Sequence, residues 1–210
     1  MNKYNVGIFI FDDVEVLDFT GPFEVFSRTR TEKGPESRKN EINAPFKVFT
    51  VSKIIKSIIA TGGLQITPSY SFKNAPLIDI LIIPGGYGTR VIIKDDKVIS
   101  WIKKISNHST VTASVCTGSL LLGEAGLLTN KKATTHWSAM NELSKYRNVY
   151  VQKQYRIVDD GIITSAGVAS GIDASFYIIS KFFSKQIVND TAKFMEYKLT
   201  NTFKNNFTSK

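Results

Sequence analysis

One stretch, Thr110–Leu128, constrains the fold more than any other part of the chain. Its first half, Thr110–Val115, is small and β-branched, which favours a short buried strand. Its second half is rich in leucine and alanine and has the length and composition of a helix. Cys116, the only cysteine in the sequence, stands between the two halves. The stretch therefore predicts a strand that turns sharply into a helix, with a thiol at the turn.

The residues around Cys116 suit such a turn. Ser114 lies two places before the thiol and Gly118 two places after it, and small residues are needed there because the backbone passes close to itself. This is the geometry of a nucleophile elbow, with sulfur in place of a serine hydroxyl. Free N–H groups and the helix dipole stabilise an anion at a helix start, so we expect the pKa of Cys116 to lie below that of an ordinary thiol. The alternative is a buried, inert cysteine.

Composition narrows the classes of protein that remain. With 210 residues, 42% of them hydrophobic, the chain is expected to form a single domain over residues 1–200, followed by a polar tail over 201–210. A single cysteine excludes an intramolecular disulfide framework and fits the cytoplasm. No apolar run approaches the ~20 residues that cross a membrane, and the amino terminus shows no signal-peptide pattern. The charge of +9 comes from scattered lysines and arginines, which favours a solvated surface over a nucleic-acid partner.

The rest of the chain alternates between strand-like and helix-like segments. Apolar runs predict buried parallel strands over Asn5–Phe11, Phe46–Ser52 and Ile78–Ile83, beside Thr110–Val115. Shorter strands or hairpins are predicted in Ile58–Pro68, Lys132–His136, Val149–Val151, Tyr155–Val158 and Gly161–Thr164. Helices are predicted from Pro22 onward and over Asp95–Asn107, Trp137–Leu143, Gly171–Phe183 and Ile187–Leu199. The polar segment Arg28–Pro45 is expected to be an exposed loop. The alternation predicts an α/β sandwich with a mostly parallel sheet.

Two features mark a ligand site at one edge of this sheet. Gly85 and Gly86 directly follow the strand Ile78–Ile83, at the carboxyl edge where open α/β sheets bind ligands. Asp18 lies among apolar neighbours, where a carboxylate is costly unless it has a partner or a task. The glycine segments lack the lysine of a phosphate loop, and the two histidines and one cysteine are too widely spaced for zinc, so we expect no nucleotide and no metal.

These residue types suit nucleophilic chemistry. The Cys116 thiolate would attack an electrophilic carbon, and Asp18, if it lies against the sulfur, would donate and accept the proton. Burial should raise the pKa of Asp18. Backbone N–H groups of Gly86 and Thr117 would form an anion hole. The Thr117 hydroxyl either positions water or substrate or is only a first-turn helix hydroxyl.

Five short motifs, in order along the chain, resemble the ThiJ/PfpI superfamily, whose members are relatives of the class I glutamine amidotransferases. The motifs are Val16–Pro22, Ile83–Gly86, Ser114–Ser119, Thr134–Trp137 and Ser165–Gly167. The resemblance extends roughly from Tyr4 to Tyr197 and is strongest to the isocyanide hydratase branch and to the sensor domains of some AraC-type regulators. It implies a flavodoxin-like three-layer sandwich with a cysteine nucleophile elbow, a homodimer and no cofactor.

The hydratase branch implies addition of water to an isocyanide carbon, which gives an N-substituted formamide through a thioimidate. The resemblance also places the loop of Gly167 and the segment of His136 near Cys116. His136 is then either a base close to the thiol or a partly buried histidine bonded to backbone.

Departures from the family pattern leave two other functions open. The superfamily's proteases carry a histidine directly after the cysteine, whereas this chain has Thr117, and many members carry a glutamate where this chain offers Asp18. The regulators continue into a DNA-binding segment, for which 210 residues leave no room. The alternatives to a hydratase are an intracellular protease or amidase, and a non-catalytic stress, glyoxalase-like or ligand-sensing protein whose cysteine reports oxidation.

Overall fold

The fold is organised around a seven-stranded sheet with the order β10-β11-β7-β6-β1-β2-β5. The structure, a computed structural model, describes residues 3–199, so the polar tail predicted over 201–210 lies outside the described residues. The strands of the sheet are β1 (Tyr4–Phe9), β2 (Phe46–Ser52), β5 (Tyr70–Ser71), β6 (Ile80–Ile83), β7 (Val111–Val115), β10 (Ile157–Asp159) and β11 (Ile163–Ser165). Every pair in the sheet is parallel except β10 with β11, which forms the predicted hairpin. The prediction that the four apolar segments are neighbouring parallel strands is confirmed.

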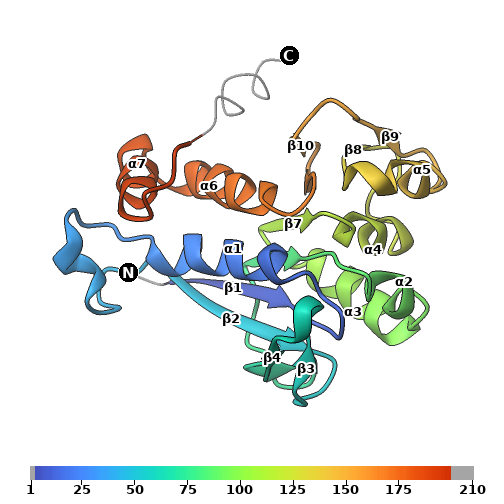
Figure 1. Cartoon of the computed structure of the whole chain (residues 1–210), viewed down its shortest axis with the longest axis horizontal. Coiled ribbons are helices and arrows are strands. Elements are labelled where there is room, and N and C mark those ends of the chain that lie inside the picture. Colours follow the sequence, from blue (N-terminus) through green and yellow to red (C-terminus); the bar gives the residue numbers. More distant parts are fainter. Residues whose placement is uncertain (1–2, 200–210) are drawn as a thin grey trace.

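Helices and two small sheets complete the fold (Figure 1). The helices are α1 (Val16–Arg28), α2 (Thr89–Ile92), α3 (Asp96–Ser106), α4 (Gly118–Glu124), α5 (Met140–Leu143), α6 (Ser170–Phe182) and α7 (Lys185–Phe194). An antiparallel hairpin joins β3 (Ile58–Ile59) to β4 (Gln65–Ile66), as predicted. A parallel pair joins β8 (Lys132–Ala133) to β9 (Tyr150–Val151). The sequence predicted most of these elements, with ends that differ by several residues, and it did not predict α2 or the edge strand β5.

The helices cover both faces of the sheet, which makes three layers. On one face, Phe26 of α1 packs against Phe46 with ring centroids 5.1 Å apart, and Tyr4 of β1 lies 6.2 Å from Phe46. On the other face, Trp101 of α3 packs against Phe9 at 5.8 Å. Tyr4 and Phe9 are an odd number of residues apart in β1, and side chains alternate along a strand, so α1 and α3 lie on opposite faces. Helices α6 and α7 contact α1, and α4 contacts α3. The α/β sandwich is confirmed.

Helix α1 begins earlier than predicted. It starts at Val16 and carries Pro22 in its interior, whereas proline at a first turn had indicated a start at Pro22. Proline removes one helical N–H, and here α1 continues through it because its apolar side packs on the sheet and on α6. The consequence is that Asp18 lies in the first turn of α1 rather than in a connecting segment.

The segment between α1 and β2 is only partly the exposed loop that its polar composition predicted: residues 32–36 and 39–42 are exposed, whereas two arginines are buried. The Arg30 side chain is fully buried and donates hydrogen bonds to the carbonyls of Ser37 (3.0 Å) and Asn40 (3.0 Å) and to the carboxylate of Glu41 (2.7 Å). Arg38 is buried as well. Part of the loop thus wraps its backbone carbonyls around a buried arginine, and composition alone cannot distinguish that arrangement from a fully solvated loop.

Candidate active site

Cys116 occupies a strained turn between β7 and α4. Its φ angle is +56°, in the left-handed region that side chains other than glycine rarely adopt. Hydrogen bonds hold the turn: the Cys116 N–H donates to the carbonyls of Ser165 (3.1 Å) and Ala166 (2.9 Å), and its carbonyl accepts from the Thr135 hydroxyl (2.9 Å). The predicted strand–cysteine–helix turn is confirmed, and the end of β11 keeps it in place.

Two glycines let the neighbouring loop press against this turn. A Cβ atom on Gly118 would lie 2.0 Å from the Ile83 carbonyl oxygen, and one on Gly85 would lie 2.5 Å from the Thr117 backbone nitrogen. Real side chains do not tolerate such distances, so only glycine fits at either place. The loop after β6 and the elbow after β7 therefore lie side by side at the carboxyl edge of the sheet, as predicted.

Asp18 is completely buried beside the thiol. Its Oδ2 accepts a hydrogen bond of 2.9 Å from the Gly85 N–H. Its Oδ1 has no well-formed hydrogen bond to a described residue, and the carboxyl group interacts with Cys116. Burial raises the pKa of Asp18 to about 7, assisted by the carboxylate of Glu15 and opposed by the Gly85 N–H. Gly85 thus positions the carboxyl group rather than a ligand.

The expected acidic thiol is wrong. Burial, followed by the nearby Asp18 carboxylate, raises the pKa of Cys116 to about 12. The N–H groups of Thr117 and Val168 and the Thr117 hydroxyl act in the opposite direction, and they do not outweigh burial. Helix α4 is short, running only over Gly118–Glu124, and it begins two residues beyond the sulfur. Burial therefore favours a protonated thiol beside a carboxyl group whose own pKa is raised.

The expected anion hole is also different. The Gly86 N–H donates to Thr117 Oγ1 (3.0 Å), which in turn donates to the Gly86 carbonyl (3.2 Å), so this N–H is already used. Thr117 joins the two loops through its side chain, and Thr89 contacts the same hydroxyl at 3.3 Å. The N–H groups near the sulfur belong to Thr117 and Val168. Val168 was not among the predicted site residues. It follows Gly167 and has a φ of +41°, which only the structure reveals.

His136 lies at the mouth of the site. Its Nδ1 is 2.7 Å from the Ser138 hydroxyl and caps the 3₁₀ turn Trp137–Ala139. A Cβ atom on Gly167 would lie 2.2 Å from His136 Cδ2, so Gly167 is needed to admit the ring. The histidine is half-buried and lines the pocket together with Cys116. This capping hydrogen bond therefore helps to hold the His136 ring in its place.

These side chains surround a pocket of about 210 Å³. Residues that the sequence did not indicate line it as well: Glu15, Tyr87, Arg90, Ser138 and Val168. Arg90 is bound to Glu142 by an ion pair of 2.8 Å at the rim. Three of the five, Glu15, Tyr87 and Val168, lie in loops. Only the fold brings these loops to Cys116, so no local sequence pattern predicts them.

Within residues 3–199, no group of three or more histidine, cysteine, aspartate or glutamate side chains is arranged to hold a metal ion. In the same part of the chain, none of the helices has both the length and the apolar character that a membrane span requires.

Comparison with known proteins identifies relatives of this chain. Isonitrile hydratase of Pseudomonas putida is 31% identical over 196 residues, which cover 92% of this chain and 77% of that protein. The transcriptional regulator GbdR of Pseudomonas aeruginosa is 23% identical, and this chain spans 48% of its length. Among solved structures, a ThiJ/PfpI family protein from Pseudomonas syringae superposes with a TM-score of 0.82 at 26% identity, covering 94% of this chain and 76% of that one.

The fold is also that of more distant proteins. DJ-1beta of Drosophila melanogaster has a TM-score of 0.77 at 20% identity and is covered along its whole length. The DJ-1/PfpI family as a whole matches residues 4–181, which include both loops, the elbow and Asp18. On this evidence the chain belongs to the DJ-1/PfpI family.

Proposed function

We propose that this protein hydrates an isocyanide to an N-substituted formamide, with Cys116 as the nucleophile and Asp18 as the acid–base group. The observation that carries the proposal is the fully buried Asp18 carboxyl group, which faces the thiol and has a pKa of about 7. The similarity to an isonitrile hydratase over 92% of the chain supports the choice of substrate. The catalytic roles below follow from the geometry and chemistry of the two side chains.

The first step needs one proton and one nucleophile. The ionised Asp18 carboxylate takes the proton from the Cys116 thiol while the sulfur forms a bond to the isocyanide carbon. The same carboxyl group then gives this proton to that carbon, whose lone pair accepts it. The product is a thioimidate on Cys116, and Asp18 is again a carboxylate. Because the raised thiol pKa disfavours a free thiolate, the proton moves to Asp18 as the S–C bond forms and not before it.

Water completes the reaction. The Asp18 carboxylate accepts a proton from a water molecule as its oxygen bonds to the thioimidate carbon, and the carboxyl group passes that proton to the nitrogen. The resulting tetrahedral adduct carries an OH group and a C–S bond. Its hydroxyl proton moves to the sulfur as the C–S bond breaks, which releases the formamide and restores the thiol. The N–H groups of Thr117 and Val168 stabilise negative charge on the sulfur as it attacks and as it leaves.

This scheme predicts a pH dependence. The active form has Asp18 ionised and Cys116 protonated, and the pKa values of these groups are about 7 and about 12. The value of kcat/KM should therefore rise as the pH increases through about 7 and then stay level to at least pH 9. A value that falls through this range would show that the protonated carboxyl group is needed before the thiol attacks.

The test is an assay of the purified protein against a small alkyl isocyanide, methylglyoxal and a set of peptides, with formamide measured by mass spectrometry. We expect formamide from the wild type, none from Cys116→Ala, and wild-type turnover from Asp96→Asn. The last variant is a matched control, because Asp96 is an exposed first-turn aspartate of α3, far from the thiol. Turnover of methylglyoxal or peptide in place of isocyanide would replace the proposed substrate. The homodimer and the cytoplasmic location stay predictions.

A further inference from the structure

A cluster of three polar side chains lies outside the pocket at Cys116. Its centre is Asp173, in the first turn of α6, whose side chain has no exposed surface. Arg156 Nε donates a hydrogen bond of 2.5 Å to Asp173 Oδ2, and the Tyr197 hydroxyl donates one of 2.8 Å to Oδ1. Arg156 lies just before β10, and Tyr197 follows α7. A buried carboxylate is costly unless its oxygens are hydrogen-bonded, so the cluster ties α6 to both of these segments.

Tyr197 is held in place independently of its hydroxyl group. Its backbone N–H donates to the Ala192 carbonyl at 2.9 Å, and its ring stacks on the buried Phe176 of α6 with centroids 5.6 Å apart. Burial, followed by the hydrogen bond to Asp173, raises the pKa of Tyr197 to about 12, so the hydroxyl is protonated at neutral pH and donates. Removing this hydroxyl would therefore delete the hydrogen bond to Asp173 and keep the packing of the ring.

Backbone hydrogen bonds connect Arg156 to the elbow. The Ala166 N–H donates to the Arg156 carbonyl at 2.9 Å, and the Cys116 N–H donates to the Ala166 carbonyl at 2.9 Å. Arg156 thus binds Asp173 through its side chain and the loop before α6 through its carbonyl. The strained left-handed conformation of Cys116 persists only if such contacts hold it.

Helix α6 holds the other end of the same loop, residues 166–169. The Ser170 N–H donates to the Gly167 carbonyl at 3.1 Å, and the Gly171 N–H donates to the Val168 carbonyl at 3.2 Å. Val168 has a φ of +41°, which is strained for a branched residue, and its N–H interacts with the Cys116 sulfur. Asp173, in the first turn of α6, therefore fixes the loop from both sides: through its own helix and through Arg156.

We propose that Asp173 is a positioning residue for Cys116: together with Arg156 and Tyr197 it holds residues 166–169 so that the Val168 N–H faces the sulfur. None of the three side chains lines the pocket, so they act through the loop and not on the substrate. The loop matters for turnover because the Val168 N–H stabilises negative charge on the sulfur as it attacks and leaves. The effect on turnover rests on the proposed function, whereas the effect on the loop does not.

A second tyrosine–aspartate pair on the same helix supplies a matched control. The Tyr177 hydroxyl donates to Asp159 Oδ2 at 2.5 Å. Asp159 ends β10 at the turn of the β10–β11 hairpin, whereas the elbow contacts Ser165 at the other end of β11. Tyr177→Phe and Tyr197→Phe each remove a hydrogen bond between a tyrosine and an aspartate, and only the second of these bonds belongs to the cluster near the elbow.

Amide hydrogen exchange measured by NMR tests the positioning without any substrate. In Tyr197→Phe we expect the amides of Cys116, Ala166 and Val168 to exchange about 10-fold faster, as loss of one hydrogen bond to a charged group would give. Arg156→Met breaks the cluster from its other side and should give the same local change. In Tyr177→Phe these amides should stay within about 2-fold of wild type. Unchanged exchange in both Tyr197→Phe and Arg156→Met, or an equal increase in Tyr177→Phe, would overturn the proposal.

Steady-state kinetics with a small alkyl isocyanide tests the consequence for turnover. Tyr197→Phe should lower kcat about 10-fold and leave KM within about 2-fold, because the cluster acts on the sulfur and does not line the pocket. Tyr177→Phe should turn over as the wild type does, even where the two variants lose similar thermal stability. Faster loop exchange together with a wild-type kcat would overturn the role in catalysis. No turnover by the wild type would remove the proposed hydratase function, and the exchange rates would still decide whether Asp173 positions Cys116.

Discussion

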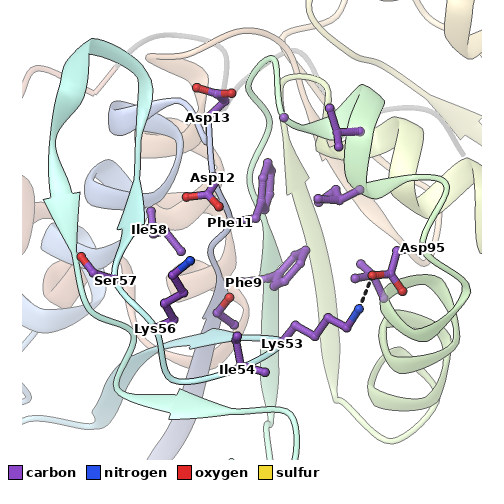
Figure 2. Close-up of a pocket in the computed structure, with 15 residues that line it drawn as sticks. Phe9, Phe11, Asp12, Asp13, Lys53, Ile54, Lys56, Ser57, Ile58 and Asp95 are labelled. Carbon is purple, nitrogen blue, oxygen red and sulfur yellow. Dashed lines mark hydrogen bonds and ion pairs between the residues drawn. The ribbon is translucent and has the colours of Figure 1, made fainter.

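The pocket at Cys116 and a second pocket, lined by Asp12, Asp13 and Lys56 (Figure 2), differ in which of their groups are buried. At Cys116 the groups that would react are buried: Asp18 has no exposed surface and the cysteine has 7%. In the second pocket the apolar wall is buried, whereas Asp12, Asp13 and Lys56 are exposed. Burial shifts the pKa of an ionisable group, whereas water screens the charge of a group that stays exposed. The comparison favours the first pocket as the place where the proposed chemistry would occur.

The difference has a consequence for stability. The cysteine pocket holds a buried carboxyl group and a left-handed cysteine, and both reduce the free energy of unfolding. The second pocket holds charges in water, where they cost little. Removing the buried carboxyl group of Asp18 should therefore abolish activity and stabilise the protein. Removing the exposed charge of Asp12 should do neither.

The largest expected effect is on turnover. Asp18→Asn should lower kcat/KM for an isocyanide by roughly 10²–10⁴-fold, because an amide delivers no proton. Asp12→Asn makes the same chemical change in the second pocket, and its turnover should stay within about 2-fold of wild type because Asp12 touches no reacting atom. Steady-state kinetics of the two variants under one set of conditions measures the contrast. Similar losses in both would mean that the pockets are not functionally separate.

The next effect is a gain of stability in Asp18→Asn that depends on pH. The pKa of Asp18 lies near 7 in the folded protein instead of 3.8, so the folded state holds this proton more tightly than the unfolded chain does. The wild type therefore loses stability as the pH rises from about 4 to about 7, with no further loss above that from this group. At pH 8 the variant should be more stable by at most about 4 kcal/mol.

Urea unfolding at pH 4, 5.5, 7 and 8 measures this gain. The curves of wild type and Asp18→Asn should coincide at pH 4 and diverge up to pH 7. Asp96→Asn, the exposed first-turn control, should stay within about 0.5 kcal/mol of wild type throughout. A variant that is less stable than wild type at pH 8 would show that the charged carboxylate stabilises the fold, contrary to the assignment of its pKa to burial.

A third comparison concerns two glycines. Gly118→Ala should destabilise the protein by about 3 kcal/mol, because the new Cβ atom would lie 2.0 Å from backbone at the elbow. Gly63, in the connection between β3 and β4, has a φ of +87° and open space around it, so Gly63→Ala should cost only about 1 kcal/mol, the conformational term alone. Thermal melting of the two variants separates packing from backbone strain. Equal losses would mean that the elbow can shift to accept a methyl group.

The same physics explains what the sequence revealed and what it did not. Thr110–Leu128 carried its own signal, because a small β-branched run, a lone cysteine and two flanking small residues specify a sharp turn locally. The neighbouring loop of Gly85 was predictable as well, since parallel strands bring their carboxyl ends to one edge. These two features fixed the sheet, the elbow and the approximate place of Asp18.

Other features depended on contacts across the fold. The thiol pKa was predicted in the wrong direction, because the helix start is visible in the sequence and the burial of Cys116 beside Asp18 is not. Val168 and Glu15 approach the sulfur through folding alone. Arg30 looked like part of a solvated loop because a buried arginine and an exposed one have the same sequence signature.

The smallest expected effect is on the rate at which Cys116 is alkylated, and it distinguishes two roles for Asp18: a proton carrier and a general base alone. Its carboxylate is the second largest cause, after burial, of the raised pKa of Cys116, so Asp18→Asn should lower that pKa and speed alkylation by iodoacetamide at pH 8 to 9 by a few-fold. Alkylation needs only the thiolate, whereas hydration also needs a proton delivered to carbon. Cys116 is the only thiol, so mass spectrometry of the labelled protein across pH reads it directly. Faster alkylation together with lost turnover would identify Asp18 as a proton carrier. Slower alkylation would instead show that Asp18 activates the thiol even for a reagent that needs no proton, and the carboxylate would then be a general base alone.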